Sequence, residues 1–111
     1  MKIYHNPRCS KSRQTLALLT ERGIEPEIVL YLESPPSVED LKDILKALGM
    51  SANQLVRKKE AEYKSLDIDE NDEEALLAAM HQFPKIIERP IVVNGQKAAL
   101  GRPPEQVLEI L

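Results

Sequence analysis

Residues 2–31 read KIYHNPRCSKSRQTLALLTERGIEPEIVLY, and this stretch decides the fold. Residues 2–5 form a short β-prone start, and the apolar run TLALL that follows the serines predicts a helix. Gly23 is typical of the residue that ends a helix. Residues 27–31 are again β-prone and predict a second strand. A strand, a helix and a strand within about 30 residues make a βαβ unit, so we expect the two strands to be parallel.

The middle of the chain, residues 37–83, has a helical pattern. Ser37 followed by Asp40 resembles a capping box. The leucines and isoleucine that come next recur at spacings of three and four, which gives the helix one apolar face. Further on, Asn71 or Asp72 is placed to cap another helix. We therefore expect a helical insert over this range.

The last part of the chain returns to strands. Residues 91–93 are strongly β-prone, and Asn94-Gly95 is the pair preferred in the type I′ turn of a hairpin. Residues 96–100 are the expected partner strand, and a last helix follows the prolines after them. The order βαβ, helical insert, ββα is that of an α/β, thioredoxin-like fold with one small mixed sheet. We expect residues 1–111 to form a single domain of this kind.

Composition argues against several classes of function. The net charge is −3 and the basic residues form no block, which argues against a nucleic-acid-binding protein. No apolar run reaches about 18 residues and no signal-peptide pattern is present, so we expect no membrane span. No Cys/His pairs stand at the spacing of a metal site, so we expect no metal. A single cysteine cannot form an internal disulfide, which together with the missing signal predicts a cytoplasmic protein.

The one cysteine, Cys9, lies where the first strand gives way to the helix, which begins at Ser10 or Ser12. The free N–H groups and the positive end of a helix dipole stabilise a thiolate there, and they also suit an oxyanion. A lone cysteine is commonly buried and inert, but the neighbours of Cys9 are polar and basic. We therefore predict a reactive thiol. Because the chain has no second cysteine, an external thiol must resolve the intermediate that Cys9 forms.

Three nearby residues can support this thiol. Ser12 takes the place of the second cysteine in a C-x-x-C motif and can donate a hydrogen bond to the thiolate. His5 either faces the thiol and lowers its pKa as an imidazolium, or is an ordinary histidine at a strand end. Arg13 follows Cys9 by one helical turn and can face the same way. The other histidine, His81, is expected to be a solvated or capping residue.

Arginines supply the argument for an anion site. The planar guanidinium suits a tetrahedral oxyanion because it bonds two oxygens at once. Taken singly, Arg57, Arg89 and Arg102 are ordinary candidates for solvated surface charges. Arg89 and Arg102 both precede a proline at a sheet end, where sites gather. Pro90 stands where tight bends contain cis bonds, and the sequence leaves its isomer open.

Five separated motifs are distributed over essentially the whole chain: His5-Asn6-Pro-x-Cys9-x-x-Ser12-Arg13, Tyr31-Leu32-Glu-x-Pro35-Pro36, Leu55-x-Arg57-Lys58, Arg89-Pro90-Ile91-Val92-Val93 and Arg102-Pro103. In order and spacing they resemble the motifs of the glutathione/glutaredoxin-linked arsenate reductases. The hairpin after Val93 is shorter than in some members of that family.

The resemblance implies a function and roles for these residues. It implies that Cys9 is the nucleophile, that His5 adjusts its ionisation, and that Arg57, Arg89 and Arg102 bind arsenate and stabilise the covalent adduct. It further implies that glutathione is a co-substrate and glutaredoxin a partner. No bound cofactor is implied, since the electrons come from thiols.

Three other functions stay open on the sequence. The same scaffold can act on another oxyanion or on a glutathione mixed disulfide. Relatives of this fold include transcription adaptors of the Spx type, but Cys9-x-x-Ser12 cannot form their disulfide switch. The last alternative is an inert binding module with an incidental thiol.

Overall fold

The computed structural model describes residues 1–111, which form two compact units. Unit 1 contains Met1–Ser34 and Arg89–Leu111, and unit 2 contains Pro35–Glu88. Unit 2 includes the whole of the predicted helical insert. Unit 1 is therefore assembled from both ends of the chain.

Unit 1 is built on one mixed four-stranded sheet in the order β2-β1-β3-β4. The first strand pairs with the second in parallel, as predicted, and with the third in antiparallel fashion, and the third and fourth form an antiparallel hairpin. The thioredoxin-like order of elements is thus confirmed. The elements are β1 (Lys2–His5), α1 (Ser10–Glu21), β2 (Glu27–Leu30), β3 (Ile91–Asn94), β4 (Lys97–Leu100) and the 3-10 helix η2 (Pro104–Ile110).

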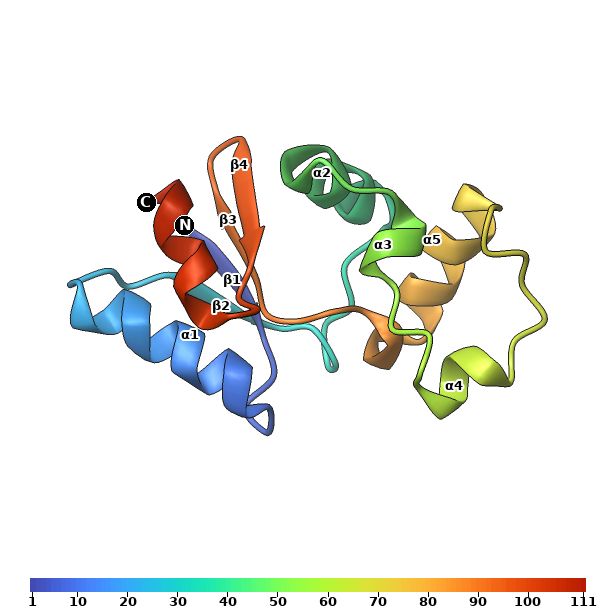
Figure 1. Ribbon diagram of the computed structural model, residues 1–111, viewed down its shortest axis with the longest axis horizontal. Coiled ribbons are helices and arrows are strands. Elements are labelled where there is room, and N and C mark those ends of the chain that lie inside the picture. Colours follow the sequence, from blue (N-terminus) through green and yellow to red (C-terminus); the bar gives the residue numbers. More distant parts are fainter. The chain divides into compact units, whose positions relative to one another are not determined.

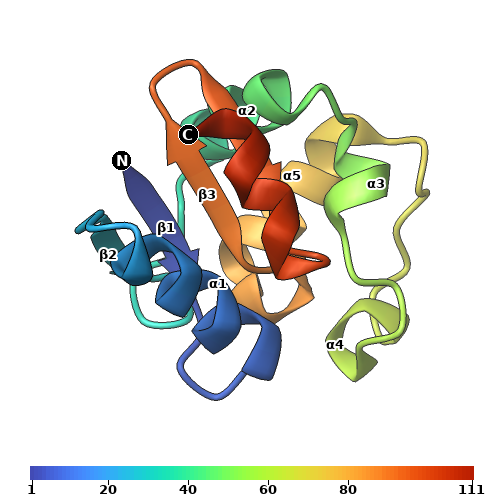
Figure 2. The same ribbon diagram turned by 60° about the vertical axis from the view of Figure 1, so that its left-hand side comes forward.

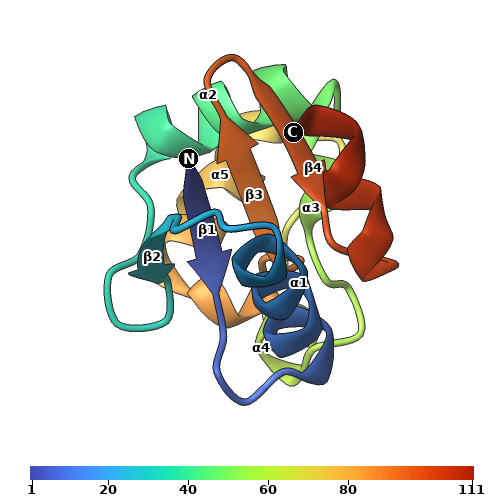
Figure 3. The same cartoon turned by 90° about the vertical axis from the view of Figure 1, so that its left-hand side faces the viewer.

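The core of unit 1 lies between the sheet and its two helices. Ile3 of β1 shares a face of the sheet with Val92 of β3, because the two residues are directly paired. Both are fully buried together with Leu19 of α1 and Val107 of η2. Figures 2 and 3 show α1 and the red C-terminal helix on the same side of the sheet. Alternation along β1 places His5 on this face too, toward α1.

The β3–β4 hairpin differs from the prediction in its turn. Asn94 pairs with Lys97, so it is the last residue of β3, and Gly95 and Gln96 form the loop. A type I′ turn needs positive φ at both loop residues, but only Gly95 has one, at 64°. A glycine with positive φ at the first loop position is the pattern of a type II′ turn. The predicted type I′ turn at Asn94-Gly95 is therefore wrong.

Unit 2 is helical, and its caps follow the sequence. The Ser37 hydroxyl accepts the N–H of Asp40, and the Asp40 carboxylate accepts the N–H of Ser37, so the predicted capping box is present. The Asp72 carboxylate accepts the N–H of Ala75 at 3.1 Å and begins the last helix of the insert. The elements, drawn in Figure 1, are α2 (Val38–Leu48), α3 (Ala52–Leu55), α4 (Ala61–Lys64), α5 (Glu73–Gln82) and the 3-10 helix η1 (Pro84–Ile86).

Two further expectations concern regions away from the thiol. His81 is exposed near the end of α5, and its Nδ1 lies 2.9 Å from the carbonyl oxygen of Pro36, which fits a local structural role. None of the helices combines the length and the apolar character that crossing a bilayer requires.

Candidate active site

Cys9 is the residue that precedes the first turn of α1. Its backbone is extended (φ −94°, ψ 124°), so the chain changes from loop to helix at this position. Its N–H donates to the carbonyl oxygen of Asn6 at 3.0 Å, and its own carbonyl accepts the N–H of Arg13 at 3.0 Å. Cys9 is 9% exposed, so the thiol is recessed at the start of the helix.

The pKa of the Cys9 thiol lies below its ordinary value. Burial by itself raises this pKa, but the backbone N–H of Ser12, the charge of Arg89 and the N–H of Lys11 lower it by more. The Arg89 side chain adds a hydrogen bond. The two N–H groups belong to the start of α1, as the sequence predicted, and the Arg89 guanidinium is an additional positive group beside the thiol. Cys9 consequently becomes a nucleophilic thiolate at a lower pH than a free thiol does.

His5 and Ser12 form a buried pair beside this thiol, and their roles differ from the expectation. His5 Nδ1 lies 2.6 Å from the Ser12 hydroxyl oxygen, which also accepts the N–H of Asn6 at 3.0 Å. The Ser12 contact to Cys9 comes from its backbone N–H, while its hydroxyl serves these two neighbours. Burial, and secondarily the charge of Arg13, lower the pKa of His5. This direction favours the neutral imidazole over the imidazolium, the first of the two alternatives that the sequence left open for His5.

A close contact between the sheet and α1 fixes the start of β3 near Cys9. The Arg89-Pro90 bond is cis, and the Pro90 carbonyl accepts the N–H of Gly101 at 3.0 Å. A Cβ on Gly101 would lie 2.3 Å from Thr15 Oγ1 and 2.7 Å from Pro90 Cγ, so only glycine fits. Thr15 is fully buried, and its hydroxyl donates to the Lys11 carbonyl at 2.8 Å. This packing holds Pro90, the residue after Arg89, close to α1.

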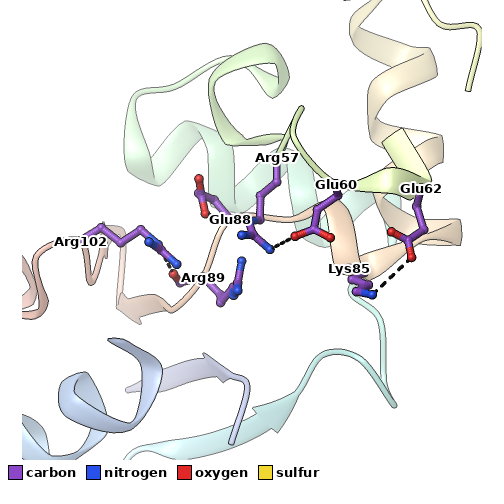
Figure 4. Close-up of polar contacts among 7 residues, drawn as sticks. All are labelled: Arg57, Glu60, Glu62, Lys85, Glu88, Arg89 and Arg102. Atoms are coloured by element: carbon purple, nitrogen blue, oxygen red, sulfur yellow. Dashed lines mark hydrogen bonds and ion pairs between the residues drawn. The ribbon is translucent and has the colours of Figure 1, made fainter. Parts of the chain in front are cut away.

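Arg102 contacts the backbone of Arg89. Its Nε donates to the Arg89 carbonyl oxygen at 2.8 Å, as Figure 4 shows. Arg102 is half-buried, and the Arg102-Pro103 bond is cis like the Arg89-Pro90 bond. The structure thus brings together Cys9, Arg89 and Arg102 in unit 1. Arg102 contacts Arg89, and Arg89 lowers the pKa of the Cys9 thiol.

Arg57 lies in unit 2, between α3 and α4, so the structure does not assign it to the unit of Cys9. Its backbone N–H donates to the carbonyl oxygen of Ile86 at 2.6 Å. Its guanidinium pairs with the carboxylates of Glu60 and, at 3.3 Å, of Glu88. Figure 4 shows the pairing with Glu60. Two carboxylates therefore balance the charge of Arg57.

Two contributors to the site were absent from the sequence argument. Lys11 donates its backbone N–H to the thiol. In the sequence, only the position of Lys11 in the first turn of the helix indicates this contact. Gly101 allows the close contact with Thr15, which no local pattern reveals because the two residues are far apart in the chain. Nowhere do three or more His, Cys, Asp or Glu side chains gather as a ligand set for a metal ion.

Known sequences resemble this one over its full length. The sequence model of the ArsC family matches residues 4–110. The uncharacterized protein YfgD of Escherichia coli K12 is 60% identical over 114 aligned positions, which cover 100% of this chain and 96% of that protein. An arsenate reductase of Haemophilus influenzae is 54% identical and covers 98% of this chain and 97% of its own length.

A solved structure shares the fold as well as the sequence. The arsenate reductase from Vibrio cholerae superposes with a TM-score of 0.95 at 54% identity, over 99% of this chain and 96% of that chain. The family match, the identity and the common fold agree over nearly every residue. This chain is a member of the ArsC family.

Proposed function

We propose that this protein is an arsenate reductase that uses Cys9 as its nucleophile. The observation that carries the proposal is the lowered pKa of Cys9, produced by N–H groups of Ser12 and Lys11 and by Arg89. The same groups that favour a thiolate favour an oxyanion next to it. The relatives named arsenate reductase give the substrate class.

The first step forms a bond between sulfur and arsenic. The Cys9 thiolate attacks arsenic(V) and displaces one oxygen as water or hydroxide, which gives a cysteinyl-arsenate adduct. Arg89 and Arg102 bind the remaining oxygens and offset their charge, and Arg57 is the third arginine of the proposed set. In this scheme His5 does not supply a positive charge to the thiolate or the arsenate oxygens. Instead it fixes the Ser12 hydroxyl through the 2.6 Å contact.

The electrons come from outside the chain, because Cys9 is the only cysteine. Glutathione attacks the adduct, glutaredoxin reduces the mixed species, and arsenite leaves. Overall, two thiols lose two electrons and become a disulfide, arsenic(V) gains them, and one oxygen departs as water. No metal takes part. Because this chemistry depends on a reduced thiol pool, we place the protein in the cytoplasm.

A coupled assay tests the proposal. Purified protein with glutathione, glutaredoxin, glutathione reductase and NADPH should oxidise NADPH in a saturable, arsenate-dependent manner. Cys9→Ser should lower the rate by at least about 10³-fold, because a hydroxyl at this position is not ionised. An active coupling system that shows no arsenate dependence with the wild-type chain would refute arsenate as the substrate. A glutathione mixed disulfide assayed in parallel tests the alternative substrate.

A further inference from the structure

The outer side of β2 is an open sheet edge. Only β1 pairs with β2, and no other segment forms a bridge to its far side. Figure 3 shows β2 beside β1 at the edge of the sheet. The Glu27 N–H donates to the Met1 carbonyl oxygen at 2.9 Å, so the backbone groups of Glu27 face β1. Because these groups alternate along a strand, those of Ile28 point away from the sheet and offer a template for another strand.

The side chains along this edge are apolar at every second residue. Ile28 is 49% exposed, Leu30 is 36% exposed, and Leu32, just after the strand, is 41% exposed. The β1 partners of Ile28 and Leu30 are buried residues on the face that α1 covers, so both side chains lie at the rim of that face. Alternate apolar side chains beside outward backbone groups are the features that bind an added peptide strand.

The charge around this edge is negative. Glu25, Glu27 and Glu33 are exposed, and residues 25–33 contain no lysine or arginine. Glu27 lies 3.8 Å from Lys2, whereas Glu25 and Glu33 form no ion pair. Antiparallel pairing of this strand with a second copy of the chain brings Glu25 of each copy toward Glu33 of the other, which is unfavourable. The same glutamates attract a strand with basic residues at its ends.

We propose that the outer edge of β2 binds an extended segment of another protein as an additional strand of the sheet. This segment has apolar side chains at alternate positions and lysine or arginine at its ends. It exchanges hydrogen bonds with the N–H and C=O of Ile28, and its apolar side chains pack beside Ile28 and Leu30. Its basic ends lie near Glu25 and Glu33. The binding does not depend on the reaction at Cys9.

Peptide titration of the full, isotope-labelled chain, followed by NMR, tests the proposal. The probe is the peptide acetyl-KKTVTVTVKK-amide. A second peptide, acetyl-EETVTVTVEE-amide, reverses the charge of the ends. A third has the sequence of the probe with N-methylated valines, which removes the N–H groups that face β2 and keeps every side chain. The backbone amide signals locate the bound peptide, and their shifts at peptide concentrations up to about 1 mM give the Kd.

Two variants separate backbone pairing from charge. Ile28→Pro removes the outward N–H of β2 without removing a hydrogen bond to β1. Glu25→Lys with Glu33→Lys reverses the charge beside the strand. Its matched control, Glu105→Lys with Glu109→Lys, changes the net charge equally on η2, where both residues are exposed. Because η2 packs against β4, this control lies toward the opposite edge of the sheet.

We expect the basic peptide to shift the amide signals of β2 and to bind about tenfold more tightly than the acidic or the N-methylated peptide. Ile28→Pro should weaken the basic peptide about tenfold. The Glu25 and Glu33 double variant should reverse the preference between the basic and acidic peptides, whereas the η2 control should keep it. This reversal tests the proposal even if Ile28→Pro fails to fold.

Amide signals of β2 that do not move with the basic peptide at about 1 mM overturn the proposal. Equal binding of the acidic peptide, or a preference that the η2 control also reverses, overturns it as well. A second copy of the chain is the other occupant of such an edge, and sedimentation equilibrium tests for it. A wild-type dimer that Ile28→Pro dissociates would assign the edge to self-association and would also overturn the proposal.

Discussion

The two units of this protein anchor their positive side chains on different partners. In unit 1, Arg13 is held by a backbone carbonyl and has no acidic partner. In unit 2, Lys58 lies 3.0 Å from Glu70, and Arg57 pairs with two glutamates. One exposed ion pair joins β1 and β2 in unit 1, whereas unit 2 contains six.

The two kinds of partner have different consequences for a ligand. A cation held by a carbonyl keeps its charge available to a ligand, whereas the charge of a cation paired with a carboxylate is balanced within the fold. A carbonyl oxygen orients a guanidinium without cancelling its charge, whereas a carboxylate cancels most of it. Arg102 also donates to a backbone carbonyl, that of Arg89. Arg57 belongs to the second kind. The three arginines that the sequence grouped together are therefore not equivalent in the structure.

Among changes that leave Cys9 in place, removing the charge of Arg89 should have the largest effect. Arg89→Ala takes away both a cation and a hydrogen bond that lower the pKa of Cys9, so this pKa should rise. We expect arsenate turnover to fall on the order of 10²–10³-fold, as when one donor to an oxyanion is deleted. The rate of Cys9 alkylation against pH should shift its midpoint upward, so that the loss is greater at pH 6 than at pH 9.

Controls for this variant separate charge from folding. Arg89→Lys keeps the charge but not the planar fork, so its alkylation profile should lie between those of the wild type and Arg89→Ala. Lys97→Ala removes a cation from the other end of the sheet and should leave the midpoint unchanged. A midpoint in Arg89→Ala equal to that of the wild type would show that the charge of Arg89 does not act on the thiol.

Packing at Gly101 should come next in size. Gly101→Ala places a Cβ 2.3 Å from Thr15 Oγ1 and 2.7 Å from Pro90 Cγ, so helix and strand must move apart. We expect a loss of about 1–3 kcal/mol in the free energy of unfolding, measured in urea. If the added Cβ clashes with the Thr15 side chain, combining Gly101→Ala with Thr15→Ala should cost less than the two single losses added together. Strict additivity would contradict this account.

The buried His5 should produce a smaller, pH-dependent effect. Burial lowers its pKa in the folded state below the ordinary value, so the unfolded chain binds more protons when the pH falls from 7 to 5. The His5 contribution therefore destabilises the fold as the pH is lowered through 6.5, and it vanishes above that value. His5→Gln should reduce the difference between unfolding free energies at pH 7 and pH 5. An unchanged difference would mean that His5 is as easily protonated in the folded chain as in the unfolded one.

Local rules predicted the elements well because the deciding residues are neighbours in the chain. Ser37 with Asp40, and Asp72 before α5, act within one helical turn. The prediction failed where partners are distant. The turn after β3 depends on the pairing of Asn94 with Lys97, which the register of the sheet sets. The lowered pKa of His5 depends on burial against α1, which strand sequence alone does not reveal.

The smallest effect should come from converting a balanced cation in unit 2 into a partly unbalanced one. Glu60→Gln removes one of the two carboxylates that pair with Arg57, while Glu88 remains 3.3 Å from its Nε. Since both partners are partly exposed, the unfolding free energy should change by less than about 1 kcal/mol. If Arg57 binds arsenate, the released charge should lower the arsenate KM about two- to fivefold. Glu62→Gln, which removes the partner of Lys85, is the matched control and should leave the KM unchanged. An equal arsenate KM in both variants would mean that Arg57 stabilises the fold and does not bind the anion. The arginines that bind arsenate would then belong to unit 1 alone.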